Sequence, residues 1–319
     1  MMMDSVLERI DEALRAWEPP EVPQDIPQGD MPGDRVWIGP QAEKKAQAVF
    51  RALLPLLREA LSANPRRRAV VAVTGGSGVG KTCVSALLTH YLSEIGVGAY
   101  THSGDNYPRR IPIQNDAERM RVFRSAGVRG LLETGEYTSE RAAALRRLQL
   151  DDLDSDPAQR AAHSWLAAYQ AAGRAALDEY LGSAAEQGYE EIGDVLRRFR
   201  AGEDKIWLRR LGRGPEDLWY EEKTFSGVSV LVLEWTHGNS GLFEGVDIPV
   251  LLSSTPAETR AYRLARGRDA NADTAFITMV LELEQAKLEA RAGTAKLIVS
   301  KACKTLTYDE YKAEMEAGR

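Results

Sequence analysis

The sequence has few cysteines, no long apolar run and no excess of basic residues, and each shortage excludes a class of protein. Two cysteines among 319 residues, Cys83 and Cys303, cannot build a disulfide framework. No apolar run approaches the ~20 residues that a helix needs to cross a bilayer, and the N-terminus lacks a signal-peptide pattern. The 41 basic residues are outnumbered by 47 acidic ones, a net charge of −6 that argues against binding to duplex nucleic acid. We therefore expect a soluble cytoplasmic protein without a membrane or nucleic-acid partner.

One glycine-rich stretch matches a phosphate-binding motif without a mismatch. Residues 75–82 read Gly-Gly-Ser-Gly-Val-Gly-Lys-Thr, which fits G-x-x-x-x-G-K-[ST]. An apolar run, 69–73, precedes the stretch, and apolar residues at helical spacing follow it. In a strand, loop and helix of this kind, backbone N–H groups and the helix N-terminus point at phosphate oxygens. The stretch predicts a nucleoside triphosphate site; a plain glycine-rich turn, the alternative, requires neither the lysine nor the threonine.

We expect the residues of this loop to bind the nucleotide. Lys81 can reach the β- and γ-phosphates, and the hydroxyl of Thr82 can bind Mg²⁺. Cys83 follows directly and is expected to be a small packing residue, with a thiol role as the alternative. The predicted nucleotide-binding residues are Gly75, Gly76, Ser77, Gly78, Val79, Gly80, Lys81, Thr82 and Cys83.

Strand and helix patterns alternate along the chain and predict an α/β fold. We expect further strands at 99–103, 228–234, 247–252 and 297–299, and helices at 4–17, 41–62, 255–267, 272–291 and 308–317. The second of these helices is expected to bend or break at Pro55. The fold predicted is a P-loop NTPase three-layer fold with a mostly parallel central sheet and a large helical insertion.

Two acidic residues end predicted strands, where parallel sheets bind their ligands. Glu234 ends the strand 228–234 and is a candidate second Mg²⁺-directed carboxylate, with a strand-end surface charge as the alternative. Asp105 follows the strand 99–103 and can serve as a general base. An ordinary Asx turn before Pro108 explains Asp105 equally well on chemistry alone.

A cluster of arginines is the fourth candidate element. Arg260, Arg263, Arg266 and Arg268 fall within nine residues, around Gly267. Guanidinium groups can stabilise the charge that develops in phosphoryl transfer, so the cluster favours a lid. The alternative is an exposed basic helix end favoured by the helix dipole.

These motifs stand in the order seen in the uridine kinase, phosphoribulokinase and pantothenate kinase group of P-loop kinases. The chain resembles that group over about residues 66–303, through the phosphate loop, Asp105-Asn106-Tyr107, the strand ending at Glu234, and Arg266-Gly267-Arg268. One departure is Trp235, which stands where the group has glycine; another is the long insertion after Asp105.

The resemblance implies a role for each candidate residue. Asp105, Lys81, Arg263 and Arg268 would be catalytic, Thr82 and Glu234 would lie near Mg²⁺, and His237 would face the acceptor, unless it is an ordinary loop histidine. Tyr107 and Arg109 follow the base and can hold an acceptor, with a basic surface loop as the alternative. Residues 1–65 have no counterpart in the resembled group, and their own pattern predicts N-terminal helices and a Pro-rich arm; 66–319 would form the kinase domain. Within that domain, 115–225 would be the substrate-side insertion, and 255–291 the lid and following helix.

The sequence therefore predicts a small-molecule kinase that uses ATP and Mg²⁺. Its acceptor would be an alcohol hydroxyl of a sugar, a nucleoside or a pantothenate-like metabolite. A regulatory GTPase or metallochaperone is one alternative, against which the chain has no Asn-Lys-x-Asp and no Asp-x-x-Gly after a strand. An ATPase subunit of an assembly is another alternative, and a homodimer is one option for the oligomeric state.

Overall fold

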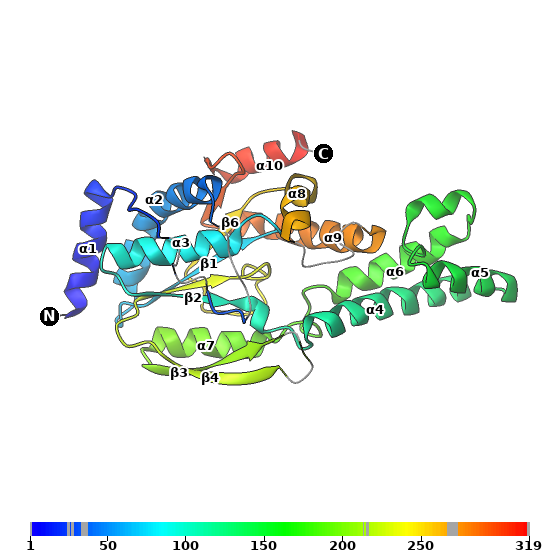
Figure 1. Ribbon diagram of the computed structural model, residues 1–319, viewed down its shortest axis with the longest axis horizontal. Helices are drawn as coiled ribbons and strands as arrows, with labels where there is room; N and C mark the ends of the chain where they lie inside the picture. Colours follow the sequence, from blue (N-terminus) through cyan, green and yellow to red (C-terminus); the bar gives the residue numbers. More distant parts are fainter. Residues whose placement is uncertain are drawn as a thin grey trace. The chain divides into compact units, whose positions relative to one another are not determined.

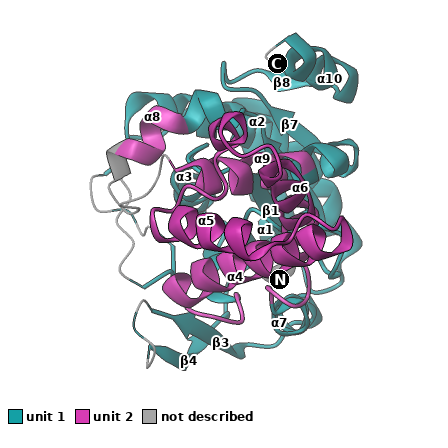
Figure 2. Ribbon diagram, turned by 90° about the vertical axis from the view of Figure 1, so that its right-hand side faces the viewer, with its two compact units in different colours: residues 1–107, 188–259, 287–319 teal, residues 108–187, 260–286 magenta. Residues whose placement is uncertain are grey.

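The apolar runs of the sequence form the strands of a six-stranded sheet (Figure 1). The structure is a computed structural model that describes residues 2–317 apart from 24, 25, 27, 28, 33–37, 213, 215, 216 and 267–273. By its contacts the chain divides into two units (Figure 2). The first unit comprises 1–107, 188–259 and 287–319, and the second comprises 108–187 and 260–286.

The sheet of the first unit is parallel except at one edge. Its strands are β2 (Ala99–Ser103), β5 (Val230–Glu234), β1 (Ala69–Gly75), β6 (Ile248–Leu252), β7 (Leu297–Val299) and β8 (Thr305–Leu306), in that spatial order. All neighbours pair in parallel except β7 and β8, which are antiparallel. Every residue of β1 is buried, as expected for a strand with both faces covered. The predicted α/β fold with a mostly parallel sheet is confirmed.

Two helices, α2 (Pro40–Ala63) and α3 (Lys81–Glu94), cover one face of this sheet, and α1 (Met2–Ala16) packs against α2 (Figure 1). Val71 and Val73 of β1 pack in this core together with Ile10 of α1 and the nearby Trp17. Helix α2 runs through Pro55 without interruption, so of the expected bend or break at this proline the break is wrong, and the bend stays a prediction. Proline removes one helical hydrogen bond, and the buried leucines on both sides of Pro55 hold α2 against the core.

The other face of the sheet is covered mainly by α7 (Tyr189–Ala201) and by the antiparallel hairpin of β3 (Lys205–Leu211) and β4 (Leu218–Thr224). Val70 and Ala72 of β1 lie in this second core with Phe199 of α7. The range 115–225 is therefore helical only as far as α7. Near the β6–β7 edge the same face packs against α10 (Tyr308–Ala317).

The second unit is built from helices. It contains α4 (Pro112–Glu133), α5 (Ser139–Leu150), α6 (Leu166–Tyr180) and parts of α8 (Pro256–Arg266) and α9 (Ala275–Arg291). Gly127 of α4 lies against the ring of Tyr169, and Gly173 of α6 lies against Phe123. A methyl group at either glycine would come closer than 3.0 Å to the facing ring, so these glycines let α4 and α6 pack closely.

Side-chain caps start two of these helical segments. Asp156 accepts a hydrogen bond of 2.9 Å from the Ala158 amide and caps the short 3-10 helix Pro157–Ala161. Reciprocal bonds between Thr255 and Glu258, at 2.9 and 3.2 Å, form a capping box at the start of α8. No helix in the described ranges combines the length and apolar composition needed to cross a bilayer.

Candidate functional site

The glycine-rich stretch forms a tight loop between β1 and α3. Gly75, Gly78 and Gly80 have φ angles of +147°, +82° and +97°, a backbone region that favours glycine. A Cβ at Gly75 would lie 2.7 Å from the carbonyl oxygen of Leu252 and 2.8 Å from Val79, so the loop has no room for one. Helix α3 begins directly after Gly80, which places its N-terminus at the loop. This backbone has the form of an anion-binding site.

Lys81 is folded onto the loop itself. Its ammonium group donates hydrogen bonds to the carbonyl oxygens of Gly75, at 3.0 Å, and Gly76, at 3.2 Å. These bonds hold the positive charge over the loop. An ammonium group is a flexible point charge on a long stem, so it can turn from these carbonyls to a phosphate.

The carboxyl ends of three neighbouring strands bring the predicted metal residues together. In the sheet register, Glu234 of β5 pairs with Val73 of β1 on one side and Ser103 of β2 on the other. Thr82 Oγ1 donates to one carboxylate oxygen of Glu234 at 2.9 Å, and Ser103 Oγ donates to the other at 2.6 Å. The structure thus joins Thr82 and Glu234, which were predicted separately.

The carboxyl group of Glu234 lies in an environment that favours its protonated form. Burial raises its pKa, and the charge of Asp105 raises it further, to about 7. Hydrogen bonds from Ser103 and Thr82 and the charge of Lys81 act in the opposite direction. A nearby cation would restore the carboxylate.

The donor set formed by Thr82 and Glu234 fits Mg²⁺, which prefers oxygen ligands and retains water. Within the described ranges, no group of three or more His, Cys, Asp or Glu side chains forms a dedicated metal cage. A magnesium ion at Thr82 would therefore take its other oxygen ligands from phosphates and water, as in P-loop sites.

Asp105 lies on the short 3-10 helix Gly104–Asn106 that follows β2. Its side chain is exposed, whereas its neighbours Gly104 and Asn106 are buried. The Asp105 amide points at Ser103 Oγ, 3.4 Å away. Because the same Ser103 Oγ lies 2.6 Å from Glu234, Asp105 lies close to the predicted metal residues, with its side chain exposed.

The side chain of Trp235 packs against Gly104 of this turn. It is 1% exposed and packs against the rings of Tyr189 and Phe243, with centroids 5.3 and 5.8 Å away. A Cβ built on Gly104 would collide with the Trp235 indole. The tryptophan that replaces the glycine of the resembled group therefore fills the space directly behind the Asp105 turn.

The predicted acceptor residues differ in their surroundings. Tyr107 is 1% exposed, and its hydroxyl lies 2.9 Å from His102 Nε2. His237 is half-buried, with its ring edge-to-face to Trp235 at 5.4 Å. Arg109 belongs to the second unit, where its guanidinium donates to the Ala184 carbonyl at 2.6 Å. Contact of these three residues with an acceptor stays a prediction.

Of the two lid arginines predicted to be catalytic and the cysteine after the phosphate loop, the structure describes Arg263 and Cys83. Arg263 lies on the portion of α8 that belongs to the second unit, and Arg268 lies outside the described residues. Cys83 is half-buried in the first turn of α3. The roles predicted for these residues stay predictions.

Two charged residues at this site come from the N-terminal segment and were not predicted. Lys45 of α2 is 7% exposed, and its ammonium donates to the Val79 carbonyl of the phosphate loop at 3.0 Å. Burial lowers the pKa of Lys45. Its position on the apolar face of α2, four residues before Val49, is a signal that the sequence does contain. Asp30, in the Pro-rich arm, bonds the residues on either side of Gly104-Asp105, and no sequence pattern marks it.

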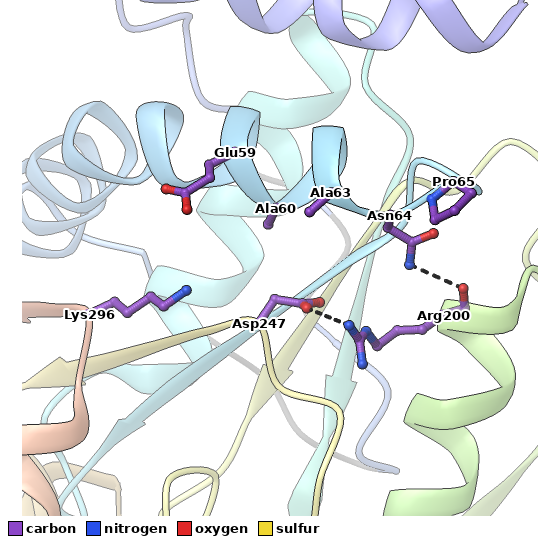
Figure 3. A pocket seen from close by; sticks show the side chains of 8 residues that line it. All are labelled: Glu59, Ala60, Ala63, Asn64, Pro65, Arg200, Asp247 and Lys296. Atoms are coloured by element: carbon purple, nitrogen blue, oxygen red, sulfur yellow. Dashed lines mark hydrogen bonds and ion pairs between the residues drawn. The ribbon is translucent and has the colours of Figure 1, made fainter.

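A separate cavity of about 260 Å³ lies at the opposite end of the strands (Figure 3). Asp247, just before β6, accepts the Val70 amide at 2.8 Å and pairs with Arg200 at 2.9 Å. These residues lie at the amino ends of β1 and β6, whereas the phosphate loop follows the carboxyl end of β1. The cavity is therefore distinct from the candidate nucleotide site. Its lining residues are Glu59, Ala60, Ala63, Asn64, Pro65, Arg200, Asp247 and Lys296.

Comparison with known proteins finds kinases. The chain is 40% identical over 238 residues to a bifunctional α-galactosidase/sucrose kinase, AgaSK, from Mediterraneibacter gnavus. This match covers 75% of the chain but 20% of the relative, so the chain spans about a fifth of that longer protein. No family model matches the chain.

Two solved structures of kinases show weaker likeness. A D-glycerate 3-kinase from Cryptococcus neoformans has a TM-score of 0.49 at 12% identity, with 82% of this chain and 97% of that one covered. A possible uridine kinase from Bacillus stearothermophilus has a TM-score of 0.42 at 13% identity, with 77% and 96% covered. At TM-scores below 0.5, neither likeness bears on the function.

Proposed function

We propose that this protein is a kinase that transfers the γ-phosphoryl group of ATP to an alcohol hydroxyl of a sugar, with Mg²⁺. One observation carries the proposal: the phosphate loop, the Thr82–Glu234 pair and the exposed carboxylate of Asp105 meet at the carboxyl ends of β1, β5 and β2. A switch or a plain ATPase needs the first two features, but a solvent-facing base beside them suits an alcohol acceptor.

The phosphate loop would hold and orient the nucleotide. Backbone amides of residues 75–83 would bind phosphate oxygens, and Lys81 would exchange the Gly75 and Gly76 carbonyls for the β- and γ-phosphates. Thr82 and Glu234 would hold Mg²⁺, with Glu234 in its ionised form. ATP supplies the phosphoryl group when bound, and Mg²⁺ offsets its charge.

Asp105 would act on the acceptor. Its carboxylate takes the proton of the hydroxyl while that oxygen bonds to the γ-phosphorus and the bond to the bridging oxygen of ADP breaks. Arg263 and Arg268 belong to this proposal as lid residues that stabilise charge on the transferred group. Tyr107, Arg109 and His237 belong to it as acceptor-side residues.

The relative with 40% identity supports a sugar as the acceptor in this proposal. Its name contains two activities, but glycoside hydrolysis typically uses a carboxylate pair around the scissile bond, whereas this chain has a phosphate loop. The proposed function therefore corresponds to the sucrose kinase of that name. Sucrose and related sugars are the first acceptors to test, before nucleosides and pantothenate-like alcohols.

The rest of the proposal follows the predicted organisation of the chain. Residues 66–319 would form the kinase domain, with 115–225 on the acceptor side and 255–291 as lid and following helix. A homodimer is testable by light scattering. The proposal places the protein in the cytoplasm, where ATP is available.

The test is ADP release by the purified chain with Mg²⁺ and ATP, with and without each acceptor, and phosphorus NMR of the product. We expect ADP release to depend on a sugar and a phosphate ester to form in equal amount. Lys81→Ala, which removes the ammonium over the loop, should abolish both signals. ATP hydrolysis that is indifferent to every alcohol would contradict the proposal and favour an ATPase.

A further inference from the structure

The N-terminal arm places one buried carboxylate against the residues on either side of Gly104-Asp105. The side chain of Asp30 is 6% exposed. It accepts hydrogen bonds from five groups: the Ser103 amide at 2.7 Å, His102 Nδ1 at 2.7 Å, the Tyr100 hydroxyl at 2.9 Å, Arg210 Nη1 at 3.0 Å and Asn106 Nδ2 at 3.3 Å. A carboxylate only accepts, so His102 Nδ1 carries the hydrogen in this contact.

Asp30 is ionised in this environment. Burial by itself raises the pKa of Asp30, but the contact with His102, the charge of Arg210 and the bond from the Ser103 amide outweigh it, so the pKa lies below its usual value. Arg210 of β3 is 3% exposed and also bonds Glu221 at 3.1 Å. A buried charge is tolerated when it is paired and fully hydrogen-bonded, as Asp30 is here.

The bonds to Asp30 hold both sides of the turn. The backbone amide of Ser103 lies just before Gly104-Asp105, and the side-chain amide of Asn106 lies just after it. Asn106 in turn accepts the Leu211 amide of β3 at 3.1 Å. Ser103 also bonds Glu234 at 2.6 Å. Asp30 therefore links the arm, β2 and β3 around the residue proposed as the base.

We propose that Asp30 is a positioning residue that fixes the Asp105 turn, so that the N-terminal arm completes the active site. This inference rests on the proposed function. Asp30 contacts the turn and not the phosphate loop, so its removal should affect transfer more than nucleotide binding. A misplacement of about 1 Å can cost about 100-fold in rate; for Asp30→Ala we expect kcat to fall by about 10- to 100-fold.

The experiment compares three full-length variants. Asp30→Ala removes all five contacts, whereas Asp30→Asn keeps one oxygen for the Ser103 amide and loses the charge. Asp11→Ala is the matched control, because Asp11 also lies in the N-terminal segment and pairs with Arg58 in an exposed contact of 2.9 Å. Transfer is measured per folded molecule, together with the dissociation constant of ATP and amide hydrogen exchange over residues 100–107.

The inference predicts a split between these measurements. Asp30→Ala should lower kcat and speed amide hydrogen exchange over 100–107, while its ATP dissociation constant stays within about twofold of wild type. In kcat and exchange rate, Asp30→Asn should lie between Asp30→Ala and wild type, and Asp11→Ala should match wild type. Equal kcat in Asp30→Ala and Asp11→Ala would overturn the inference. Unchanged exchange over 100–107 would also overturn it, even if the wild type transfers to no acceptor. That absence of transfer would by itself refute the proposed function.

Discussion

The contact between Gly104 and Trp235 predicts that Gly104→Ala destabilises the wild-type protein but not a variant that lacks the Trp235 side chain. Gly104 does not have a positive φ angle, so an alanine backbone is acceptable there and only space opposes it. The space is taken by the Trp235 indole, which a Cβ at residue 104 would meet. Because Trp235 is 1% exposed and wedged against Tyr189 and Phe243, it cannot move aside easily.

The expected magnitudes follow from packing. Overpacking a core typically costs about 1–3 kcal/mol, which we expect for Gly104→Ala in the wild type. Truncating a buried tryptophan costs about 3–5 kcal/mol, which we expect for Trp235→Ala. With the indole absent, alanine at residue 104 should be neutral or stabilising by up to about 1 kcal/mol, because it restricts the unfolded chain. The coupling energy of the pair is the difference between these two costs, about 1–4 kcal/mol.

The assay is a double-mutant cycle of the free energy of unfolding, measured by urea denaturation of the four proteins. Acceptor-dependent turnover is measured alongside, since the turn carries Asp105. We expect Gly104→Ala to lower turnover in the wild-type background at equal folded concentration. If Gly104→Ala costs the same within about 0.5 kcal/mol in both backgrounds, the indole does not fill the space behind the turn and the reasoning fails.

Three further predictions concern single groups of the site. Asp105→Asn should leave the ATP dissociation constant within about twofold but lower sugar-dependent transfer by about 10²–10⁴-fold, because general-base catalysis is lost; most of the turnover surviving would place the base elsewhere. Lys45→Met leaves the Val79 carbonyl without its buried donor, and we expect it to lower the free energy of unfolding by about 1–3 kcal/mol and weaken ATP binding. The matched change at exposed Lys44 should do neither, and equal effects at both positions would contradict the role of Lys45. The pKa of Asp30 lies below its usual 3.8, so its ionised carboxylate stabilises the fold above pH 3.8, and this contribution is lost as the pH falls through the lowered pKa. The free energy of unfolding of Asp30→Asn should therefore fall less steeply with decreasing pH than that of the wild type. If the two plots of unfolding free energy against pH run parallel, Asp30 is not ionised in the folded protein.

The fold could be predicted where the pattern was local. Strands β1, β5 and β6 are short apolar runs buried on both faces, and each was predicted within two residues of its bounds. Strand β4 was not predicted, because nearly all of its residues are exposed and its sequence, Leu-Trp-Tyr-Glu-Glu-Lys-Thr, carries no burial pattern. Its pairing with β3 is a tertiary property.

The candidate site shows the same limit. Thr82 and Glu234 could be identified because each stands at a motif or strand end, and parallel strands bring such ends together. The role of Trp235 could not be identified, since it depends on Gly104, more than a hundred residues away in the chain. Asp30 has no pattern at all, because its five partners are assembled only in the folded protein.

The contacts made by the N-terminal segment have a property that bears on how the site is maintained. Lys45 bonds the carbonyl of Val79, and Asp30 bonds the amide of Ser103. Both partners are main-chain atoms, which any residue at positions 79 and 103 would provide, except that proline at position 103 would lack the amide. The contact of Lys45 can therefore persist when the side chain at position 79 changes, whereas Asp30 also depends on the side chains of Tyr100, His102 and Asn106 around the turn. In contrast, a substitution of Lys45 or Asp30 leaves a buried main-chain group without its partner, at a cost of about 1–3 kcal/mol. The residues least tolerant of change outside the phosphate loop should therefore include these two, although both lie in a segment with no motif.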